Sequence, residues 1–401
     1  MMEKDPIKFE NSLAGKTVVV AATASISIYR LPDIIRDLRR EGASVIVGMS
    51  REATELISPE VLKWASENEV ITKITGEIEH ISRFIGQPEN TLMLACPASY
   101  NFIGKAASGI SDDVPSLFFS FALGNGNPVV ISPVMHEGMM VNPINASNLK
   151  KLEDAGVSII PPRIEEQKAK ISENEKILDY VSRAFSGHFL KNMSVLVIGG
   201  KGEEKIDPVR NITNSGTGLT ASWLLRNSFR LGAKKITFVG NSQYVIPDYV
   251  DYHPAKFMEE YEGVVAGILK KERFDVVINV ASLSDFELKE KFREKLDSSA
   301  EVALHLSPRK KLNHRIREHH KGFLVVFKLS KETGIQQIRD GFSDVNPDLI
   351  IFNPYTEKSV PFGTTRNAYT AIFRESEERL GVLAKPEMTM QIMKIISSRM
   401  K

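Results

Sequence analysis

The strongest constraint on the fold is an alternation of short apolar runs with amphipathic runs, which occurs twice along the chain. The β-branched run at 17–22 predicts a buried strand, and Leu31, Ile34, Ile35 and Leu38 then repeat at the spacing of one helix face. Buried strands that alternate with helices indicate a parallel sheet whose crossover helices cover both faces. The chain is therefore predicted to be an α/β protein.

The pattern begins again near residue 192, which predicts two Rossmann-like three-layer domains, residues 1–190 and residues 191–401. The stretch at 161–191 is polar and predicts a connector with a helical piece around 177–185. In the first domain, the other predicted elements are strands at 44–49, 92–95, 128–132 and 158–160 and a helix at 145–155. In the second domain, they are strands at 194–198, 235–239, 276–280, 323–327 and 349–352 and helices near 219–231, 255–271 and 386–400.

Composition and charge exclude several classes of protein. The 401 residues are 42% hydrophobic and 25% charged, and the net charge of +2 favours neither nucleic acid nor an anionic membrane as a partner. Prolines and glycines interrupt the longest uncharged stretch, 114–135, and the N-terminal residues are polar, so we expect a cytoplasmic protein with no membrane helix and no secretory signal. Cys96 is the only cysteine, which excludes an intrachain disulfide, and we expect it to be a small buried residue.

Three segments of the first half follow predicted strands and carry candidate ligand-binding residues. Residues 23–30 (TASISIYR) place small and hydroxyl residues at a strand-to-helix turn, which suits a phosphate, although an ordinary helix cap has the same composition. Residues 97–105 (PASYNFIGK) and 133–140 (PVMHEGMM) also follow strands, and parallel sheets bind ligands at the carboxyl ends of their strands. His80 is the best general acid–base candidate of this half, although a lone histidine is more often a surface residue.

Together these segments resemble the homo-oligomeric flavin-containing cysteine decarboxylases, which have a flavodoxin-like fold. The family's T-G-S-I-A-A-Y-K, P-A-S-A-N-T-I-A-K and P-x-M-N-x-x-M-W segments match 23–30, 97–105 and 133–140. The resemblance implies FMN as cofactor, decarboxylation of phosphopantothenoylcysteine, and His80 and His136 as catalytic residues. The FMN-binding residues that it implies are Thr23, Ser25, Ile26, Ser50, Pro97, Ala98, Ser99, Asn101, Met135 and Met139.

The first half departs from this family at three places. Ala24 replaces a glycine of the phosphate turn, and His136 replaces the asparagine that positions the substrate carboxylate. The family's flap carries a proton-donating cysteine, whereas residues 162–171 contain none and offer Lys168 or Lys170 instead. The departures leave open a second reading, in which the first half is a non-catalytic FMN-binding or oligomerisation scaffold.

The second half carries a longer signature, at residues 199–218. Its glycines let the backbone approach a phosphate, and the segment leads into a helix N-terminus, although a flexible surface loop is the plain alternative. The segment resembles the phosphopantothenate–cysteine ligase signature G-G-T-x-E-x-I-D-P-V-R-x-I-x-N-x-S-S-G, and weaker matches follow at 279–286, 294–296, 327–329, 348–353, 362–363 and Asn367.

The ligase resemblance implies a fold like that of this family and an acyl-nucleotide intermediate formed from CTP with Mg²⁺. Asn214 would contact this intermediate, and Lys295 would stabilise charge at the α-phosphate. The nucleotide- and substrate-binding residues that it implies are Gly199, Gly200, Asp207, Arg210, Asn279, Val280, Ala281, Asp285 and Phe327, with Asp285 reading the base. No metal ligand is identified from the sequence.

The two resemblances together predict two linked steps of coenzyme A synthesis, with 4′-phosphopantothenate, L-cysteine and CTP as substrates. They also imply a homo-oligomer, because the first family forms trimers and the second forms dimers. ATP in place of CTP remains open, since residues 307–310 (SPRK) replace the family's N-P-D-I nucleotide contact. A flavin decarboxylase with an unrelated partner domain is disfavoured by the 206–214 segment, and a dinucleotide-dependent dehydrogenase by the lack of a GxGxxG turn.

Overall fold

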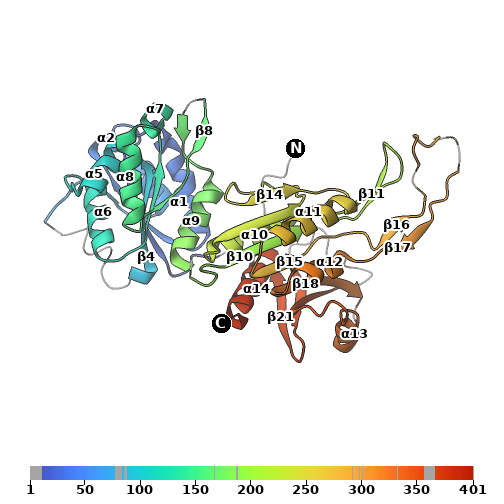
Figure 1. The fold of residues 1–401 in the computed structure, drawn as a ribbon. Coiled ribbons are helices and arrows are strands. Elements are labelled where there is room, and N and C mark those ends of the chain that lie inside the picture. The colour runs from blue at the N-terminus through green and yellow to red at the C-terminus, as the bar shows by residue number, and fades with distance from the viewer. Residues whose placement is uncertain are drawn as a thin grey trace. The chain divides into compact units, whose positions relative to one another are not determined.

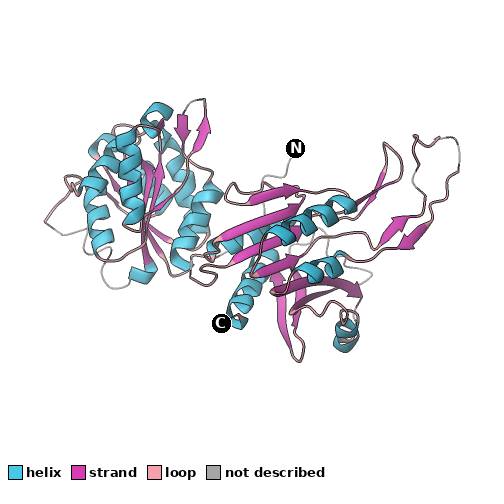
Figure 2. Ribbon diagram, in the orientation of Figure 1, coloured by secondary structure: helices cyan, strands magenta, loops and turns pink. Residues whose placement is uncertain are grey.

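The computed structural model describes residues 11–76, 84, 88–166, 168–186, 188–290, 292–297, 299, 301–331, 333–355 and 366–400. The described residues form two compact units, one over 11–186 and one from His188 to Met400. Each unit is built around its own central sheet with helices on both faces (Figures 1 and 2). This arrangement confirms the predicted α/β class for both halves.

The first sheet has six parallel strands in the order β3-β2-β1-β4-β5-β7. The central strand β1 is buried from Val18 to Ala22, which explains its continuous apolar sequence. The strand order reverses between β1 and β4, and sheets of this kind bind ligands beside such a reversal. The strands are β1 (Thr17–Ala22), β2 (Ser44–Met49), β3 (Val70–Ile71), β4 (Thr91–Ala98), β5 (Val129–Pro133) and β7 (Ser158–Ile159).

Two hydrophobic layers cover the faces of the first sheet (Figure 1). Helices α1 (Leu31–Arg40), α3 (Pro59–Ser66) and α9 (Asn174–Ser186) form one layer, and α5 (Tyr100–Ser108), α6 (Val114–Gly124) and α8 (Pro143–Asp154) form the other. The shorter elements are η1 (Ile26–Arg30), α2 (Arg51–Thr54), η2 (Pro88–Asn90) and α7 (Glu137–Met140).

The prediction that 161–191 is a connector was wrong for most of that stretch. Ile177 and Val181, one helical turn apart on α9, are fully buried in the first core. Two short strands, β8 (Arg163–Glu165) and β9 (Lys168–Lys170), form an antiparallel sheet with β6 (Met135–His136). Most of the charged residues that suggested a linker are exposed or half-buried, with Asp179 as a buried exception, and the stretch up to Ser186 belongs to the first unit.

The second sheet has eight strands in the order β14-β13-β10-β15-β18-β19-β20-β21. The first six are parallel, and β20 and β21 complete the sheet as antiparallel strands, which the sequence analysis did not predict. Here the strand order reverses between β10 and β15. The strands are β10 (Ser194–Gly199), β13 (Lys235–Gly240), β14 (Asp251–Pro254), β15 (Val276–Asn279), β18 (Phe323–Lys331), β19 (Leu349–Tyr355), β20 (Arg366–Ile372) and β21 (Glu377–Ala384).

Helices cover the second sheet, and two hairpins extend it. Helices α11 (Met258–Lys271), α12 (Leu312–His319) and α13 (Ile335–Asp340) contribute to one core layer, and α10 (Leu219–Arg230) packs against α14 (Lys385–Arg399). The hairpin β11–β12 (Glu203–Lys205 and Asn211–Thr213) follows β10, and the hairpin β16–β17 (Phe286–Leu288 and Leu306–Pro308) follows β15 (Figure 1). Among the described residues, no helix is both long and apolar enough to span a membrane.

Candidate functional site

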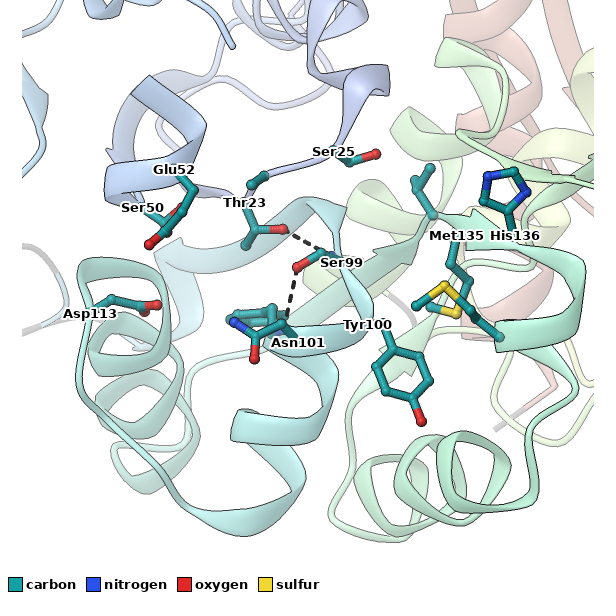
Figure 3. A pocket seen from close by; sticks show the side chains of 14 residues that line it. Thr23, Ser25, Ser50, Glu52, Ser99, Tyr100, Asn101, Asp113, Met135 and His136 are labelled. Carbon is teal, nitrogen blue, oxygen red and sulfur yellow. Dashed lines mark hydrogen bonds between the residues drawn. The ribbon is translucent and has the colours of Figure 1, made fainter. Parts of the chain in front are cut away.

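A pocket of about 330 Å³ opens at the carboxyl ends of the strands in the first sheet (Figure 3). Its walls come from the segments that follow β1, β2, β4 and β5, and from the start of α6. The pocket therefore lies at the reversal of strand order, where the sequence placed a ligand. The lining residues are Thr23, Ala24, Ser25, Ser50, Glu52, Ser99, Tyr100, Asn101, Phe102, Asp113, Val134, Met135, His136 and Met139.

Thr23 ties the turn after β1 to the turn after β4. Its hydroxyl donates a hydrogen bond to the carbonyl of Pro97 at 2.8 Å and accepts one from the backbone N–H of Ser99 at 2.9 Å. The residue is buried, with 3% of its surface exposed. Thr23 thus shapes the floor of the pocket, because its hydroxyl is already used within the protein.

Three helix starts point their N-termini towards the pocket. Ser50 caps α2 by accepting from Ala53 N, and Ser99 caps α5 by accepting from Phe102 N at 3.3 Å. Ser25 is the residue before η1 and makes no such cap hydrogen bond. Unpaired N–H groups and the partial positive charge of helix N-termini attract anions. This part of the pocket suits a phosphate group.

Asp113 places a carboxylate in the same pocket. Burial alone would raise the pKa of Asp113, but hydrogen bonds from Ser116 and an ion pair with Lys105, at 2.9 Å, outweigh burial and lower this pKa. Asp113 therefore stays ionised and offers a hydrogen-bond acceptor to donor groups of a ligand. The segment Asp113–Ser116 has the composition of a helix capping box, so the sequence signals the cap but not the pocket.

The opposite wall is apolar and ends in a histidine. Met135 lies beside His136, which is exposed at the rim (Figure 3), and Met139 also lines the pocket. His136 is directly opposite Lys168 in the β6–β9 pairing. Lys170, in contrast, already pairs with Glu165 and Glu166.

The structure brings together most of the residues that the sequence assigned to FMN. Of the ten, Thr23, Ser25, Ser50, Ser99, Asn101, Met135 and Met139 line the pocket. Ile26 is 77% exposed and Ala98 is buried within β4, and neither these two nor Pro97 lines it. His80 lies outside the described residues. Tyr100, Phe102 and Val134 also line the pocket and belong to the predicted segments 97–105 and 133–140, whereas Glu52 and Asp113 were missed by the sequence analysis.

Cys96 is a core residue, as expected. Its side chain is fully buried, and burial raises the pKa of its thiol to about 12. A thiol in this state is a poor nucleophile and a poor proton donor at neutral pH.

In the second unit, the glycine turn lies at the carboxyl end of β10. Gly200 has φ +87°, and a Cβ there would lie 2.1 Å from the carbonyl oxygen of Asn241. A Cβ on Gly199 would lie 2.4 Å from the Cβ of Ala221 on α10. Both glycines are therefore required for close packing of the protein itself, and they leave the turn beside the β10/β15 reversal without side chains.

Asn214 and the turn after β15 meet at this edge. The Asn214 side chain donates to the carbonyls of Ser282 and Leu283, both at 3.1 Å. This brings Asn214 next to the predicted segment Asn279–Ala281, whose first residue donates to Asn313 Oδ1 at 2.7 Å. Both N–H groups of the Asn214 side chain are used in these two hydrogen bonds. Asn214 can therefore donate to a phosphate only if it gives up its hydrogen bond to Ser282 or Leu283.

A second group of predicted ligase residues lies at the tip of the β11–β12 hairpin. Asp207 and Arg210 form the tip and bind the backbone of Leu296, next to the exposed Lys295. Asn214 is at the other end of this hairpin, a separation of roughly 10 Å for three extended residues. The predicted ligase residues thus form two groups joined by one hairpin.

Two further predicted residues and one arginine that was not predicted also lie in the second unit. Asp285 is exposed and lies 3.8 Å from Lys311, and Phe327 is half-buried in β18. Arg309 pairs with the buried Glu204 of β11 at 2.8 Å and with Glu287 of β16 at 3.0 Å, and so joins the two hairpins. The spacing of these residues along the sequence does not predict that Arg309 contacts Glu204 and Glu287. Across the described residues, no three His, Cys, Asp or Glu side chains gather in a way that would hold a metal ion.

Comparisons with known proteins agree with this two-part architecture. Residues 7–186 match the family described as Flavoprotein, and residues 190–400 match the DNA/pantothenate metabolism flavoprotein C-terminal domain. The coenzyme A biosynthesis bifunctional protein CoaBC of Thermococcus kodakarensis is 35% identical over 384 residues, which are 94% of this chain and 93% of that protein. The chain belongs to the CoaBC family. It is an enzyme of coenzyme A biosynthesis with a flavoprotein decarboxylase domain and a ligase domain.

Other similar proteins include a second archaeal CoaBC. The CoaBC protein of Methanocaldococcus jannaschii is 32% identical over 349 residues, 85% of this chain and 84% of that protein. A crystal structure of the C-terminal domain of a CoaBC protein is 21% identical, covers 53% of this chain and 98% of its own chain, and has a TM-score of 0.44. Membership of the CoaBC family confirms the identification of both halves and their order along the chain.

Proposed function

We propose that this CoaBC chain catalyses two successive steps of coenzyme A synthesis. The ligase half joins L-cysteine to 4′-phosphopantothenate through an acyl-nucleotide made from CTP, and the flavoprotein half decarboxylates the product to 4′-phosphopantetheine. The observation that supports this most is that each unit of a CoaBC-family chain presents its predicted loops at its own reversal of strand order. The family resemblance of the two halves further supports a cytoplasmic homo-oligomer, trimeric through the first unit and dimeric through the second, with small-molecule partners and neither nucleic acid nor membrane.

The residues of the first pocket fit FMN. The helix starts at Ser25, Ser50 and Ser99 suit its phosphate, and Met135 and Met139 suit the apolar faces of its ring. When bound, FMN would take two electrons from the thiol-bearing carbon of the substrate, which allows the neighbouring carboxylate to leave as CO₂, and would then return them to the decarboxylated product to give 4′-phosphopantetheine.

The protein's own contribution to decarboxylation is placement and proton transfer. His136, exposed at the rim, can donate a hydrogen bond to the substrate carboxylate and so hold it at the pocket mouth. The decarboxylated carbon then needs a proton. His80 is the proposed acid–base residue of this half, and Cys96 is too deeply buried to take part.

In the ligase half, a carboxylate oxygen of phosphopantothenate attacks the α-phosphorus of CTP, and pyrophosphate leaves. The amine of cysteine then attacks the acyl carbon, and CMP leaves. Gly199 and Gly200 leave room for the backbone to approach the phosphates, Asn214 contacts the acyl phosphate, and Lys295 stabilises the charge that develops at the α-phosphorus. Mg²⁺ would enter with the nucleotide's phosphates.

A charge substitution tests the FMN assignment. Aspartate is a good helix-capping residue, so Ser25→Asp should fold, yet its carboxylate would repel the flavin phosphate. Ser58→Asp is the matched control, because Ser58 caps α3 outside the pocket. Fluorescence titration should show FMN binding weakened by Ser25→Asp only, with riboflavin, which lacks the phosphate, unaffected. Equal FMN affinity in the two variants would contradict the assignment.

A second variant tests the ligase assignment separately. Asn214→Ala should abolish CMP release from CTP, phosphopantothenate and cysteine, while decarboxylation of added phosphopantothenoylcysteine continues. Unchanged CMP release would remove Asn214 from the proposed site.

A further inference from the structure

Asp207 uses its whole carboxylate for contacts within the protein. Oδ1 accepts hydrogen bonds from the backbone N–H groups of Val209 and Arg210, both at 2.7 Å. Oδ2 accepts from Arg210 Nη1 at 2.7 Å and from the backbone N–H of Leu296 at 3.1 Å. The side chain is 0% exposed. Since a carboxylate has about four acceptor sites, Asp207 cannot bind a ligand without losing one of these partners.

These hydrogen bonds join two segments that are distant in sequence. Arg210 Nη1 also donates to the carbonyl of Leu296 at 3.2 Å, so both backbone groups of Leu296 are held. The backbone N–H of Phe292 donates to the carbonyl of Ile206 at 2.9 Å. Lys295 lies between these two attachment points, which restrain the backbone that carries it.

The other end of the same hairpin is fixed to the edge of the sheet. Gly202 N donates to the carbonyl of Ser282 at 3.0 Å, and Asn214 donates to the carbonyls of Ser282 and Leu283. The hairpin therefore connects the turn after β15, where the ligase site is proposed, to the segment that carries Lys295.

We propose that Asp207 is a positioning residue of the ligase half, which holds Lys295 at a set place relative to the turn after β15 and does not itself contact the nucleotide. This inference rests on the proposed ligase function. Lys295 is exposed and reaches its target through a flexible four-carbon stem, so the precision of its placement comes from its backbone. A displacement of about 1 Å at a reacting group costs roughly 100-fold in rate.

The attachment is stable throughout the working pH range. Burial would raise the pKa of Asp207, but hydrogen bonds from the amides of Val209, Leu296 and Arg210 and from the Arg210 side chain outweigh burial and lower this pKa to about 2. The contribution of an acid with a lowered pKa is present above its ordinary pKa and is lost only as the pH falls towards the lowered one. The effect of replacing Asp207 should therefore be the same at neutral and mildly alkaline pH.

Asp207→Asn separates positioning from binding. The asparagine can keep an acceptor for Val209 and Arg210, but its NH₂ group faces the N–H of Leu296, which releases that segment. We expect single-turnover pyrophosphate release to slow by roughly 10- to 100-fold, with little change in CTP affinity. Lys295→Ala should slow pyrophosphate release to a similar extent. The double variant should be no slower than Lys295→Ala, because both substitutions remove the same contribution to the rate, that of a correctly placed Lys295.

The matched control is Asp297→Asn, on the same segment. Among the described residues, Asp297 accepts from the backbone N–H and the hydroxyl of Ser299, both on its own segment, so its replacement should leave the rate unchanged. If Asp207→Asn does not fold, as judged by thermal unfolding, Asp207→Ser, which keeps a hydroxyl acceptor, replaces it in the same cycle.

The outcomes separate this inference from the proposed function. Weaker CTP binding at an unchanged rate, or effects of Asp207→Asn and Lys295→Ala that multiply, would overturn the positioning role while leaving ligase activity intact. A wild-type chain that releases no pyrophosphate from CTP and phosphopantothenate would overturn the proposed function, and the positioning role with it.

Discussion

Gly200 is a position where a single added methyl group should damage the ligase half. It has φ +87°, a conformation that residues with a Cβ rarely adopt. A Cβ there would lie 2.1 Å from the carbonyl oxygen of Asn241 and 2.9 Å from its carbonyl carbon. Both are backbone atoms and cannot rotate away, so Gly200→Ala must shift the loop that follows β13.

The cost follows from the contacts of that loop. The left-handed conformation costs an alanine about 1–2 kcal/mol. A shift of Asn241 also strains its hydrogen bonds to Lys201 O and Ala255 O, both at 2.8 Å, and a buried hydrogen bond left unmade costs about 1–3 kcal/mol. The sum, about 2–5 kcal/mol, corresponds to a fall in the unfolding midpoint of roughly 4–20 °C for a unit of this size.

Thermal unfolding of the full chain measures this effect, with bound flavin as a separate report on the first unit. The control is Gly263→Ala in α11, where nothing lies within 4 Å of an added Cβ. Alanine is the better helix former, so this control should raise stability by about 0.5–1 kcal/mol. A Gly200→Ala chain that unfolded no earlier than wild type and formed the acyl-nucleotide at the same rate would show that the turn tolerates a side chain at this position.

Three further substitutions have defined outcomes. Thr23→Val leaves the N–H of Ser99 without its acceptor and should lower the free energy of unfolding by about 1–3 kcal/mol. It should also weaken FMN binding in a fluorescence titration. If neither quantity changed, water would be replacing the hydroxyl. Arg309→Ala leaves the buried carboxylate of Glu204 without this partner and should lower the free energy of unfolding, measured in urea, by about 3–5 kcal/mol. Adding Glu204→Gln should restore part of the lost stability. If it restored none, the loss of this ion pair would not be the cause. Burial lowers the pKa of His320 below its ordinary value of 6.5, so the unfolded chain takes up a proton that the folded chain does not, and stability should fall as the pH drops below that value. His320→Asn should flatten this part of the stability profile, and an unaltered profile would assign it to other groups.

The central strands could be predicted because they are buried on both sides. β1 and β2 have the bounds that their apolar runs indicated, and β10 and β13 differ by one residue. A strand buried on both faces carries a continuous apolar run, and this signal does not depend on the partner strand.

Elements at the edges of the units could not be predicted in the same way. β21 (Glu377–Ala384) is largely exposed and rich in charge, so its sequence has neither an apolar run nor a clear alternation. The stretch from Pro161 to Ser186 looked like a linker because its charges outnumber its buried residues, yet Ile177, Leu178 and Val181 pack α9 against the sheet. β21 and the 161–186 stretch were missed for the same physical reason. An element that is added to an existing sheet needs only a few apolar side chains to hold it there, so its sequence carries a weak hydrophobic pattern.

In the candidate sites, too, some residues could be predicted from the local sequence and others could not. The loops after β1 and β4 carry hydroxyl and amide groups, the loop after β5 carries methionines and a histidine, and the structure gathers them in one pocket. Asp113 was missed because its local signal is that of a helix cap. The hydrogen bond from Leu296 to Asp207 joins residues 89 positions apart, and no local pattern reports such a contact.

The proposed function requires that one chain carries both chemical steps. Its most direct test supplies the purified, FMN-loaded chain with 4′-phosphopantothenate, L-cysteine and CTP, and measures CMP and CO₂ over the same time course. Both should be released, finally in equal amounts, with 4′-phosphopantetheine as the product. CMP released without CO₂ would show that the first unit is a scaffold and not a decarboxylase, and release of neither would contradict the account for both halves.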